Sequence, residues 1–248
     1  PLRPAAAQAW QDAAAVAGAD PARPHAEGRA ARDLLDRATA TAAETLGAAD
    51  GVVWTASGTE AIHLAVVGAA RAAAERGAPR RHLVTSAVEH SAVLAAADGL
   101  ARRSGYEVTV VGVDRSGAID PDEVRAALRP DTLSVHLQHA NHEVGALQPT
   151  HEVAHACREI GALLHVDACQ TVGQVGVTLE QVGADLLSAS AVKFGGPRGV
   201  GLLAIGARGR VAPLLEGDDR QRRRRARLHR KAAAAPASML PLVEETAA

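Results

Sequence analysis

The sequence predicts an α/β fold: a three-layer arrangement in which helices flank a mostly parallel central sheet. Short apolar segments alternate with longer, alanine-rich helical segments from residue 28 to residue 206. Strands that alternate with helices pair in parallel, because each helix returns the chain to the same end of the sheet. Aromatic residues make up only 2% of the chain, so the core must consist of Ala, Val and Leu, which suits close packing of helices on a sheet.

The predicted elements begin with a helix over residues 28–46 and follow in order along the chain. Strands are expected at 51–56, 81–87, 106–113, 132–140, 162–168, 184–190 and 199–206. The helices between them are expected at 58–77, 91–105, 120–130 and 150–161. Asp120 and Thr150 are of the residue types that cap helix N-termini. Pro121 suits the first turn after Asp120, and Gly161 suits a helix C-terminus.

The overall composition argues against several classes of function. The formal net charge is −1, which gives no general attraction to nucleic acid or to a membrane surface. No apolar run approaches the roughly 20 residues that span a bilayer, and no signal peptide is visible. Two cysteines do not make a disulfide framework, so a reducing, cytoplasmic setting is expected. The arginine-rich tail is expected to be a solvated helix or disordered, with nucleic-acid binding as the alternative.

Polar side chains follow the predicted strands at the ends where parallel sheets bind ligands. They are Thr59, His90, Asn141, His142, Asp167 and Ser190. Lys193 stands nearby in the segment SASAVKFGGPRGVG, among small and apolar residues where a lysine is costly unless its amine has a role. An amine in a partly desolvated pocket forms Schiff bases with carbonyl compounds, which suggests pyridoxal 5′-phosphate as the cofactor.

Pyridoxal 5′-phosphate makes three demands on its site, and the sequence has a candidate for each. Asp167 ends an apolar strand and is a candidate partner for the pyridine nitrogen. The Gly58–Thr59 pair opens a helix, where backbone N–H groups bind phosphate. His90 is a candidate to stack on the ring. Each residue also has an ordinary structural interpretation. Asp167 would cap a turn and Thr59 would simply begin a helix. His90 would be a hydrogen-bonded structural histidine, and Lys193 would be a surface lysine.

Five segments, in this order, resemble the cysteine desulfurases, which are pyridoxal-phosphate enzymes of the class V aminotransferase family with fold type I. The segments are SGTEA, EHSAVL, ANHEVGALQP, HVDACQTVGQ and DLLSASAVKFGGPRGVG. The resemblance implies that Lys193 binds the cofactor covalently, that Asp167 pairs with its pyridine nitrogen and that Gln170 bonds its phenolic oxygen. It also implies phosphate contacts from Gly58, Thr59 and Ser190, stacking and catalysis by His90, and a place for Asn141 and His142 near the substrate carboxylate.

The implied reaction converts L-cysteine to L-alanine and passes sulfur to an acceptor thiol, for iron–sulfur cluster assembly or thiolation. A homodimer, and a sulfur-acceptor protein as partner, are implied as well. Two alternatives stay open: another C–S lyase such as selenocysteine lyase, and a catalytically impaired or non-catalytic protein that keeps the fold.

The chain departs from the family pattern at several places. Val192 stands where the family usually has His, and His142 stands where it often has Asn. The segment GDDRQRRRRARLHRK replaces a Gly-rich segment with a phosphate-binding Thr, and a frameshift near residue 217 would explain it. We therefore expect a cofactor-binding large domain over 1–215 and a divergent tail over 216–248, without the small domain that carries the persulfide cysteine.

One motif points to a different class of protein. HEVAH, residues 151–155, matches the H-E-x-x-H pattern of zinc metalloproteases, in which His151 and His155 share one helix face and Glu152 is the base. No third ligand stands out, so no metal site is expected. Cys157 and Cys169 are expected to be small buried hydrophobic residues rather than sulfur acceptors.

Overall fold

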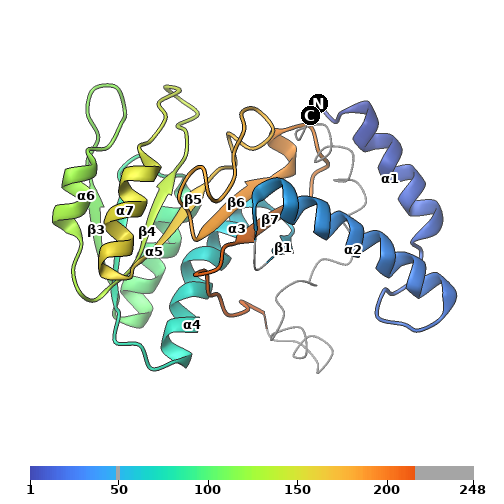
Figure 1. Ribbon diagram of the computed structural model, residues 1–248, viewed down its shortest axis with the longest axis horizontal. Helices are drawn as coiled ribbons and strands as arrows, with labels where there is room; N and C mark the ends of the chain where they lie inside the picture. Colours follow the sequence, from blue (N-terminus) through green and yellow to red (C-terminus); the bar gives the residue numbers. More distant parts are fainter. Residues whose placement is uncertain (49–50, 216–248) are drawn as a thin grey trace.

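The computed structural model describes residues 1–48 and 51–215 (Figure 1). The tail over 216–248, with the helix or disorder expected for it, lies outside the described residues. Within the described residues, no helix combines the length and the apolar character that a membrane crossing requires.

The described residues form one seven-stranded sheet with the strand order β1-β7-β6-β5-β4-β2-β3. The strands are β1 Val52–Thr55, β2 His82–Ser86, β3 Glu107–Val111, β4 Thr132–Gln138, β5 Leu163–Asp167, β6 Leu186–Ser190 and β7 Gly201–Ile205. The pairs from β3 through β6 are parallel, while β7 runs antiparallel to both β6 and β1. The predicted mostly parallel sheet is therefore confirmed.

The helices connect these strands as the alternating pattern predicts. They are α1 Pro4–Val16, α2 Ala26–Leu46, α3 Gly58–His63, α4 Ala69–Glu75, α5 Ser91–Ser104, α6 Pro121–Ala127 and α7 Thr150–Ile160, with a π-helical turn η1 Leu64–Gly68 and a 3-10 turn η2 Ala191–Lys193. The single helix expected over 58–77 is thus one continuous run, α3, η1 and α4, with a π turn inside it. The sequence analysis did not predict α1, which pairs with the outer half of α2 beside the sheet (Figure 1).

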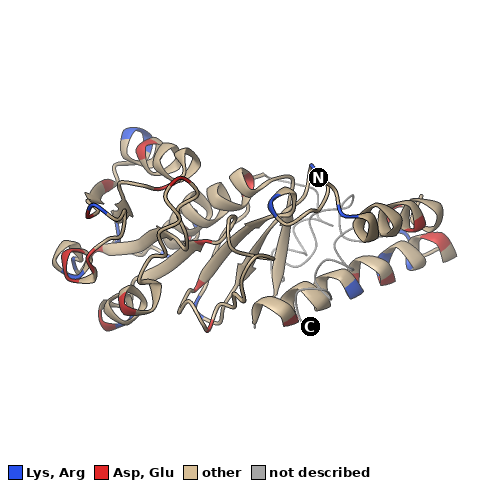
Figure 2. Ribbon diagram, turned by 90° about the horizontal axis from the view of Figure 1, so that it is seen from above, with Lys and Arg blue, Asp and Glu red and all other residues tan. Residues whose placement is uncertain are grey.

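Helices cover both faces of the sheet. On one face α2, α6 and α7 pack through Leu35, Val124 and Val153 against strand residues such as Val135 and Leu164. On the other face the run from α3 to α5 buries a second set of apolar residues: Ile62, Val66, Val93, Leu100, Leu186 and Leu203. Charged residues lie mainly on the outer helices and loops, and the strands carry few (Figure 2). Because strand positions alternate between the two faces, the sheet needs apolar residues on both sides.

Two of the three predicted helix ends are correct. The Asp120 side chain accepts a hydrogen bond from the Asp122 N–H at 2.9 Å, and Gly161 ends α7 in the left-handed conformation with φ 71°. Thr150, however, is not a cap: it is the first residue of α7, its side chain is buried, and Pro149 holds the cap position. The Thr150 N–H bonds the Gln148 carbonyl at 2.8 Å, in the turn that leads into the helix.

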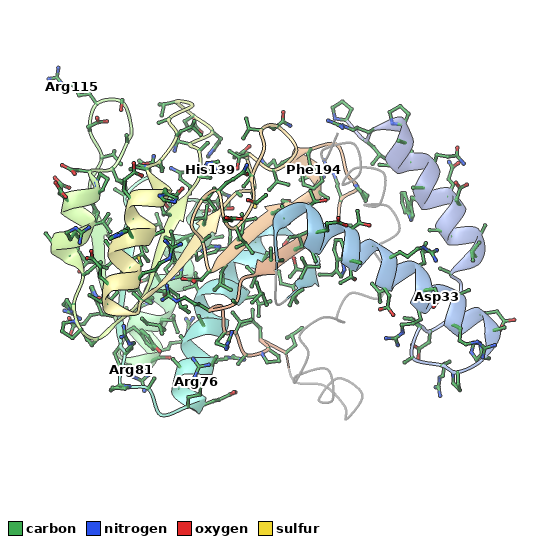
Figure 3. All side chains as sticks on the ribbon, in the orientation of Figure 1. Asp33, Arg76, Arg81, Arg115, His139 and Phe194 are labelled. Carbon is green, nitrogen blue, oxygen red and sulfur yellow. The ribbon has the colours of Figure 1, made fainter. Side chains whose placement is uncertain are left out.

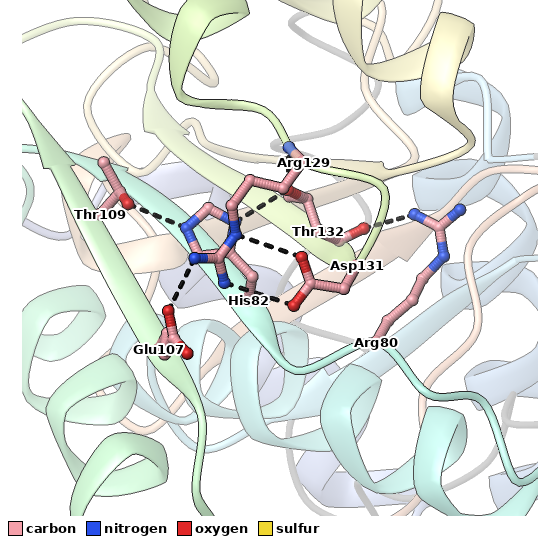
Figure 4. Close-up of polar contacts among 7 residues, drawn as sticks. All are labelled: Arg80, His82, Glu107, Thr109, Arg129, Asp131 and Thr132. Carbon is pink, nitrogen blue, oxygen red and sulfur yellow. Dashed lines mark hydrogen bonds and ion pairs between the residues drawn. The ribbon is translucent and has the colours of Figure 1, made fainter.

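A polar cluster joins the amino ends of β2, β3 and β4 (Figure 4). The ring of His82 is buried and contacts Thr132 Oγ1 at 2.8 Å and Thr109 Oγ1 at 2.9 Å. Burial lowers the pKa of His82, so the ring is a neutral link between strands. Arg129 pairs with Glu107 at 2.6 Å across the outside of the cluster. This end of the sheet is closed by structural bonds, which leaves the carboxyl end for ligands.

Candidate functional site

The candidate site lies at the carboxyl ends of β2, β4, β5 and β6, beside the first turn of α3. Figure 3 marks this end by His139 and Phe194, while Arg76 and Arg81 mark the opposite end. Every site residue predicted from the sequence belongs to a loop or helix start that leaves this edge, or to the last residues of a strand. The parallel pairing of the strands is the reason, since it brings their carboxyl ends together.

The first turn of α3 is built by the sequence Ser57-Gly58-Thr59-Glu60. Ser57 Oγ accepts from the Glu60 N–H at 3.1 Å, and Glu60 Oε2 accepts from the Ala56 N–H at 2.7 Å, in the manner of a capping box. These bonds use the N–H groups of Glu60 and Ala56. Those of Gly58 and Thr59 belong to the first turn, where a helix has no carbonyl of its own to offer.

Gly58 allows this turn to sit directly against the ends of β5 and β6. A Cβ atom on Gly58 would lie 2.8 Å from Cys169 Sγ and 3.0 Å from Ser190 Cβ. Both distances are closer than carbon and sulfur atoms tolerate without movement. The structure therefore packs Gly58 directly against Ser190 and Cys169 at the positive end of a helix.

Asp167 is the last residue of β5 and is only 7% exposed. Its Oδ1 accepts from Ser188 Oγ at 2.9 Å and from the Cys169 N–H at 3.1 Å. The second bond is the turn cap that the ordinary interpretation expects. Neither of these two bonds uses Oδ2.

Lys193 closes the short turn that follows β6, and its side chain is exposed. Its carbonyl accepts from Gln174 Nε2 at 3.1 Å, which ties the turn to the loop after β5. Burial raises the pKa of the Cys169 thiol well above its usual value, and the charge of Asp167 adds to the rise, while the charge of Lys193 opposes it. The charges of Asp167 and Lys193 are thus both within electrostatic range of the Cys169 thiol.

The loops after β2 and β4 supply His90, Asn141 and His142. His90 is exposed, and its Nδ1 accepts from the Ala92 N–H at 3.1 Å, so it caps α5 as the structural interpretation expects. Asn141 is buried and its Oδ1 accepts from the Glu143 N–H at 2.9 Å, which shapes its own loop. His142 is exposed and lies 3.3 Å from Glu143. Stacking by His90 stays a prediction.

Gln170 and Thr59 complete the predicted set. Gln170 is half-buried directly after Cys169, and Thr59 is exposed on the first turn of α3. Their predicted contacts with a cofactor stay predictions.

Glu89 is a residue at this edge that the sequence analysis missed. It is buried beside His90, and its Oε1 accepts from Ser86 Oγ at 2.6 Å and from the Gln138 N–H at 2.8 Å. Its Oε2 has no hydrogen-bond partner among the described residues. Burial, with a smaller contribution from the charge of Asp167, raises the pKa of Glu89 to about 8. The available signal was an acid three residues after an apolar strand, similar to the one that identified Asp167 at the end of β5.

The zinc interpretation of HEVAH finds no support in the described part of the chain. His151, Glu152 and His155 are exposed on α7, and His155 pairs with Glu159 at 3.2 Å. The described residues contain no group of three or more His, Cys, Asp or Glu side chains that could hold a metal ion.

Neither cysteine is placed as a reactive thiol. Both are free. Cys157 is fully buried on α7, and burial raises the pKa of its thiol to about 12. Cys169 is half-buried, with its raised pKa described above. A thiol that stays protonated at neutral pH is a poor nucleophile.

Comparison with known proteins gives one consistent result. The sequence model of the aminotransferase class-V family matches residues 7–238. A cysteine desulfurase IscS of Dictyoglomus turgidum is 39% identical over 208 residues, which cover 84% of this chain and 52% of that protein. One from Anaeromyxobacter dehalogenans is 42% identical over 195 residues, 78% of this chain and 47% of that protein. The chain spans about half the length of the curated relatives it matches.

Solved structures agree in fold over almost the whole chain. A NifS-like protein superposes with a TM-score of 0.88 at 27% identity and covers 99% of this chain and 67% of that chain. DndA from Streptomyces lividans superposes with a TM-score of 0.82 at 32% identity, covering 99% of this chain and 68% of that one. SspA, solved in complex with cysteine, superposes with a TM-score of 0.85 at 26% identity, covering 98% and 70%.

Proposed function

Because the chain belongs to the aminotransferase class-V family, we propose that it holds pyridoxal 5′-phosphate at the carboxyl end of its sheet and acts on L-cysteine. One observation carries the proposal. The buried acid Asp167 accepts from the N–H of Cys169, Cys169 packs against Gly58 at the start of α3, and the exposed Lys193 closes the turn after β6, the strand that pairs with β5. An acid for the ring nitrogen, an amine for the aldehyde and a helix N-terminus for the phosphate, all at one edge of a sheet, suit this cofactor.

The phosphate would fit the first turn of α3. Gly58 has no side chain to fill the space beside Ser190 and Cys169. The N–H groups of Gly58 and Thr59 point from the positive end of a helical run that continues to Glu75. The hydroxyls of Thr59 and Ser190 would supply further donors. Val192, in place of the family's usual His, supplies none.

The ring would fit between Asp167 and His90. Asp167 would hold the pyridine nitrogen through Oδ2, Gln170 the phenolic oxygen, and Lys193 the aldehyde carbon covalently. Bound in this way, the cofactor supplies an electron sink for bond breaking at the amino acid. Asp167 would keep a compensating negative charge at the ring nitrogen, and the exposed amine of Lys193 would be free to move a proton when substrate displaces it. His90, Asn141 and His142 would border the substrate.

The overall reaction we propose is L-cysteine plus an acceptor thiol giving L-alanine plus the acceptor persulfide. The C–S bond of cysteine breaks, an S–S bond forms on the acceptor, and the acceptor's proton balances the new methyl group. Cys157 and Cys169 are the two cysteines of the chain, and the raised pKa of each keeps it protonated at neutral pH. We therefore place the acceptor thiol outside residues 1–248.

We extend the proposal to a homodimer that works in the cytoplasm. Large apolar side chains are exposed in the loops around the site: Val144, Leu147, Val175 and Val192. A second copy of the chain would cover them, as exposed apolar residues near a ligand site favour association. Both cysteines are free thiols, which fits a reducing compartment.

Covalent trapping tests the cofactor site. The chain has two lysines, Lys193 and Lys231, so Lys231→Ala is a matched control for Lys193→Ala. Protein incubated with pyridoxal 5′-phosphate should gain a visible absorption band that borohydride abolishes, and peptide mass spectrometry should find the reduced adduct on Lys193. Lys231→Ala should behave like the parent, and Lys193→Ala should retain no adduct. An adduct on Lys231 or the N-terminus, or none at all, contradicts the proposal.

A turnover assay tests the activity separately. Alanine and sulfide should form from L-cysteine in the presence of a thiol reductant, and Lys193→Ala should form neither. A larger product yield from selenocysteine than from cysteine would assign a selenocysteine lyase. A trapped adduct without alanine from either amino acid would support the cofactor site and overturn the activity.

A further inference from the structure

A continuous line of hydrogen bonds crosses the sheet and ends on Asp167. Ser134 Oγ lies 2.9 Å from His136 Nε2, and His136 Nδ1 lies 3.2 Å from His165 Nδ1. His165 Nε2 lies 3.2 Å from Ser188 Oγ, which donates to Asp167 Oδ1 at 2.9 Å. The first four residues are 0% exposed. Bulk solvent therefore does not reach their side chains.

The strand register explains why these side chains meet. His136 on β4 pairs with His165 on β5, and Asp167 on β5 pairs with Ser188 on β6. Ser134 and His136 are two residues apart, as are His165 and Asp167, so each pair shares a face of its strand. The residue inside each pair, Val135 on β4 and Val166 on β5, belongs to the core on the opposite face. The line therefore lies on the side of the sheet that carries α3 and Gly58.

Both rings are neutral. Burial lowers the pKa of His136 to about 3. Burial, and then the neighbouring His136, lowers the pKa of His165 well below its usual value. A neutral imidazole has one N–H donor and one acceptor nitrogen, so each ring in the line can donate in only one direction.

This limit determines where every proton lies. The single Ser188 proton goes to the carboxylate, so Ser188 Oγ must accept from His165 Nε2–H. His165 Nδ1 is then an acceptor, and His136 must donate to it from Nδ1–H. His136 Nε2 is then an acceptor, and the Ser134 hydroxyl must donate to it. All four bonds point toward Asp167.

We propose that Ser134, His136, His165 and Ser188 form a one-directional hydrogen-bond relay that positions Asp167. The aligned donors hold Oδ1 in place and present a row of dipoles to its negative charge, because bonds in such a chain polarise one another. Oδ2 takes no part in these bonds. The four residues are positioning residues, and their link to a ring nitrogen rests on the proposed function.

The tautomers of the two histidines test the relay on cofactor-free protein. In ¹⁵N-labelled protein with assigned ring signals, His165 should carry its proton on Nε2 and His136 on Nδ1, and both should stay neutral from pH 8 to pH 5. The Nδ1–H form is the informative result, because nothing but an accepting neighbour requires it. The proposal would be overturned if both rings carried their proton on the same nitrogen, or if either ring became protonated between pH 8 and pH 5.

Two variants on the same strand sharpen the test. Ser188→Ala removes the acceptor for His165 and should change the ring ¹⁵N shifts of both histidines. Ser190→Ala, two residues along β6 and outside the relay, should leave both unchanged. Unchanged shifts in Ser188→Ala would overturn the relay. In protein loaded with pyridoxal 5′-phosphate, Ser188→Ala should weaken cofactor binding by about tenfold, the order expected for a lost bond to a charged group. Failure of cofactor binding in the parent protein would contradict the proposed function and leave the tautomer result standing.

Discussion

Ser188 Oγ lies 2.9 Å from Asp167 Oδ1, and the two residues face each other across the paired strands β6 and β5. The position of the carboxylate therefore depends on β6 as well as on its own strand. Lys193 follows the same strand β6. The acid is thus carried by β5, and the amine by the short turn η2 that directly follows its partner strand β6.

Gly58→Ala should destabilise the protein and weaken phosphate binding. The new Cβ would lie 2.8 Å from Cys169 Sγ and 3.0 Å from Ser190 Cβ, so the α3 turn must move. Overpacking of this kind costs roughly 1–3 kcal/mol. Urea unfolding should show the loss, and Gly58→Ala combined with Cys169→Ala should recover part of it, because the closest contact is then gone.

Gly18→Ala is the control for this prediction. Nothing lies within 4 Å of the position that its Cβ would take. Its unfolding free energy should be unchanged or slightly higher than that of the parent. If Gly58→Ala has the same unfolding free energy as Gly18→Ala, α3 does not pack as closely against Cys169 as the structure indicates.

Glu89→Gln should change how stability depends on pH. The pKa of Glu89 rises from its ordinary 4.5 to about 8 in the folded protein. Between these values the unfolded chain loses the proton and the folded protein keeps it. This group's contribution to stability is therefore complete below pH 4.5 and is lost as pH rises toward 8, by at most about 1.4 kcal/mol per pH unit.

The glutamine variant keeps an oxygen for the bonds from Ser86 and Gln138 but does not titrate. In urea unfolding from pH 5 to pH 8, the unfolding free energy of Glu89→Gln should rise relative to that of the parent as pH rises. Parallel curves for the two proteins would show that Glu89 ionises normally in the fold.

His136→Leu should have the opposite pH signature. The pKa of His136 falls from an ordinary 6.5 to about 3, so its contribution to stability is present above pH 6.5 and is lost as pH falls toward 3. The variant should be less stable than the parent at pH 7, because Ser134 and His165 lose a partner. The difference in unfolding free energy between parent and variant should then shrink below pH 6.5, by at most about 1.4 kcal/mol per pH unit. A constant difference from pH 7 to pH 4 would contradict the burial of a neutral ring.

Cys169 should react slowly with iodoacetamide at pH 8 in the folded protein. Its raised pKa leaves little thiolate, and the charge of Lys193 opposes that rise. Lys193→Ala should therefore slow alkylation further, while Lys231→Ala should not. A Cys157→Ala background isolates the signal, and urea gives the rate of the unprotected thiol. Faster alkylation of Cys169 in Lys193→Ala would contradict a position of the lysine amine near the Cys169 thiol.

The sequence analysis identified the site's acid, amine and helix start but not the residues that support them. Asp167, Lys193 and Gly58 were found because a charged residue or a glycine interrupts an apolar pattern. Glu89 shows the same signal and was missed, since its neighbour His90 attracted the functional interpretation. His136 and His165 looked like ordinary strand residues, because nothing local says that two histidines 29 positions apart share a bond.

The sequence by itself determined the order of helices and strands, the mostly parallel sheet and the edge at which polar residues gather, because apolar periodicity and strand–helix alternation are local properties. Only the tertiary structure decided which strands are neighbours, that β7 runs antiparallel between β6 and β1, and that a line of neutral rings leads to Asp167. Strand neighbours are chosen by packing between segments distant in the chain. Burial then sets the protonation of Glu89, His136 and His165, and burial exists only once those segments have met.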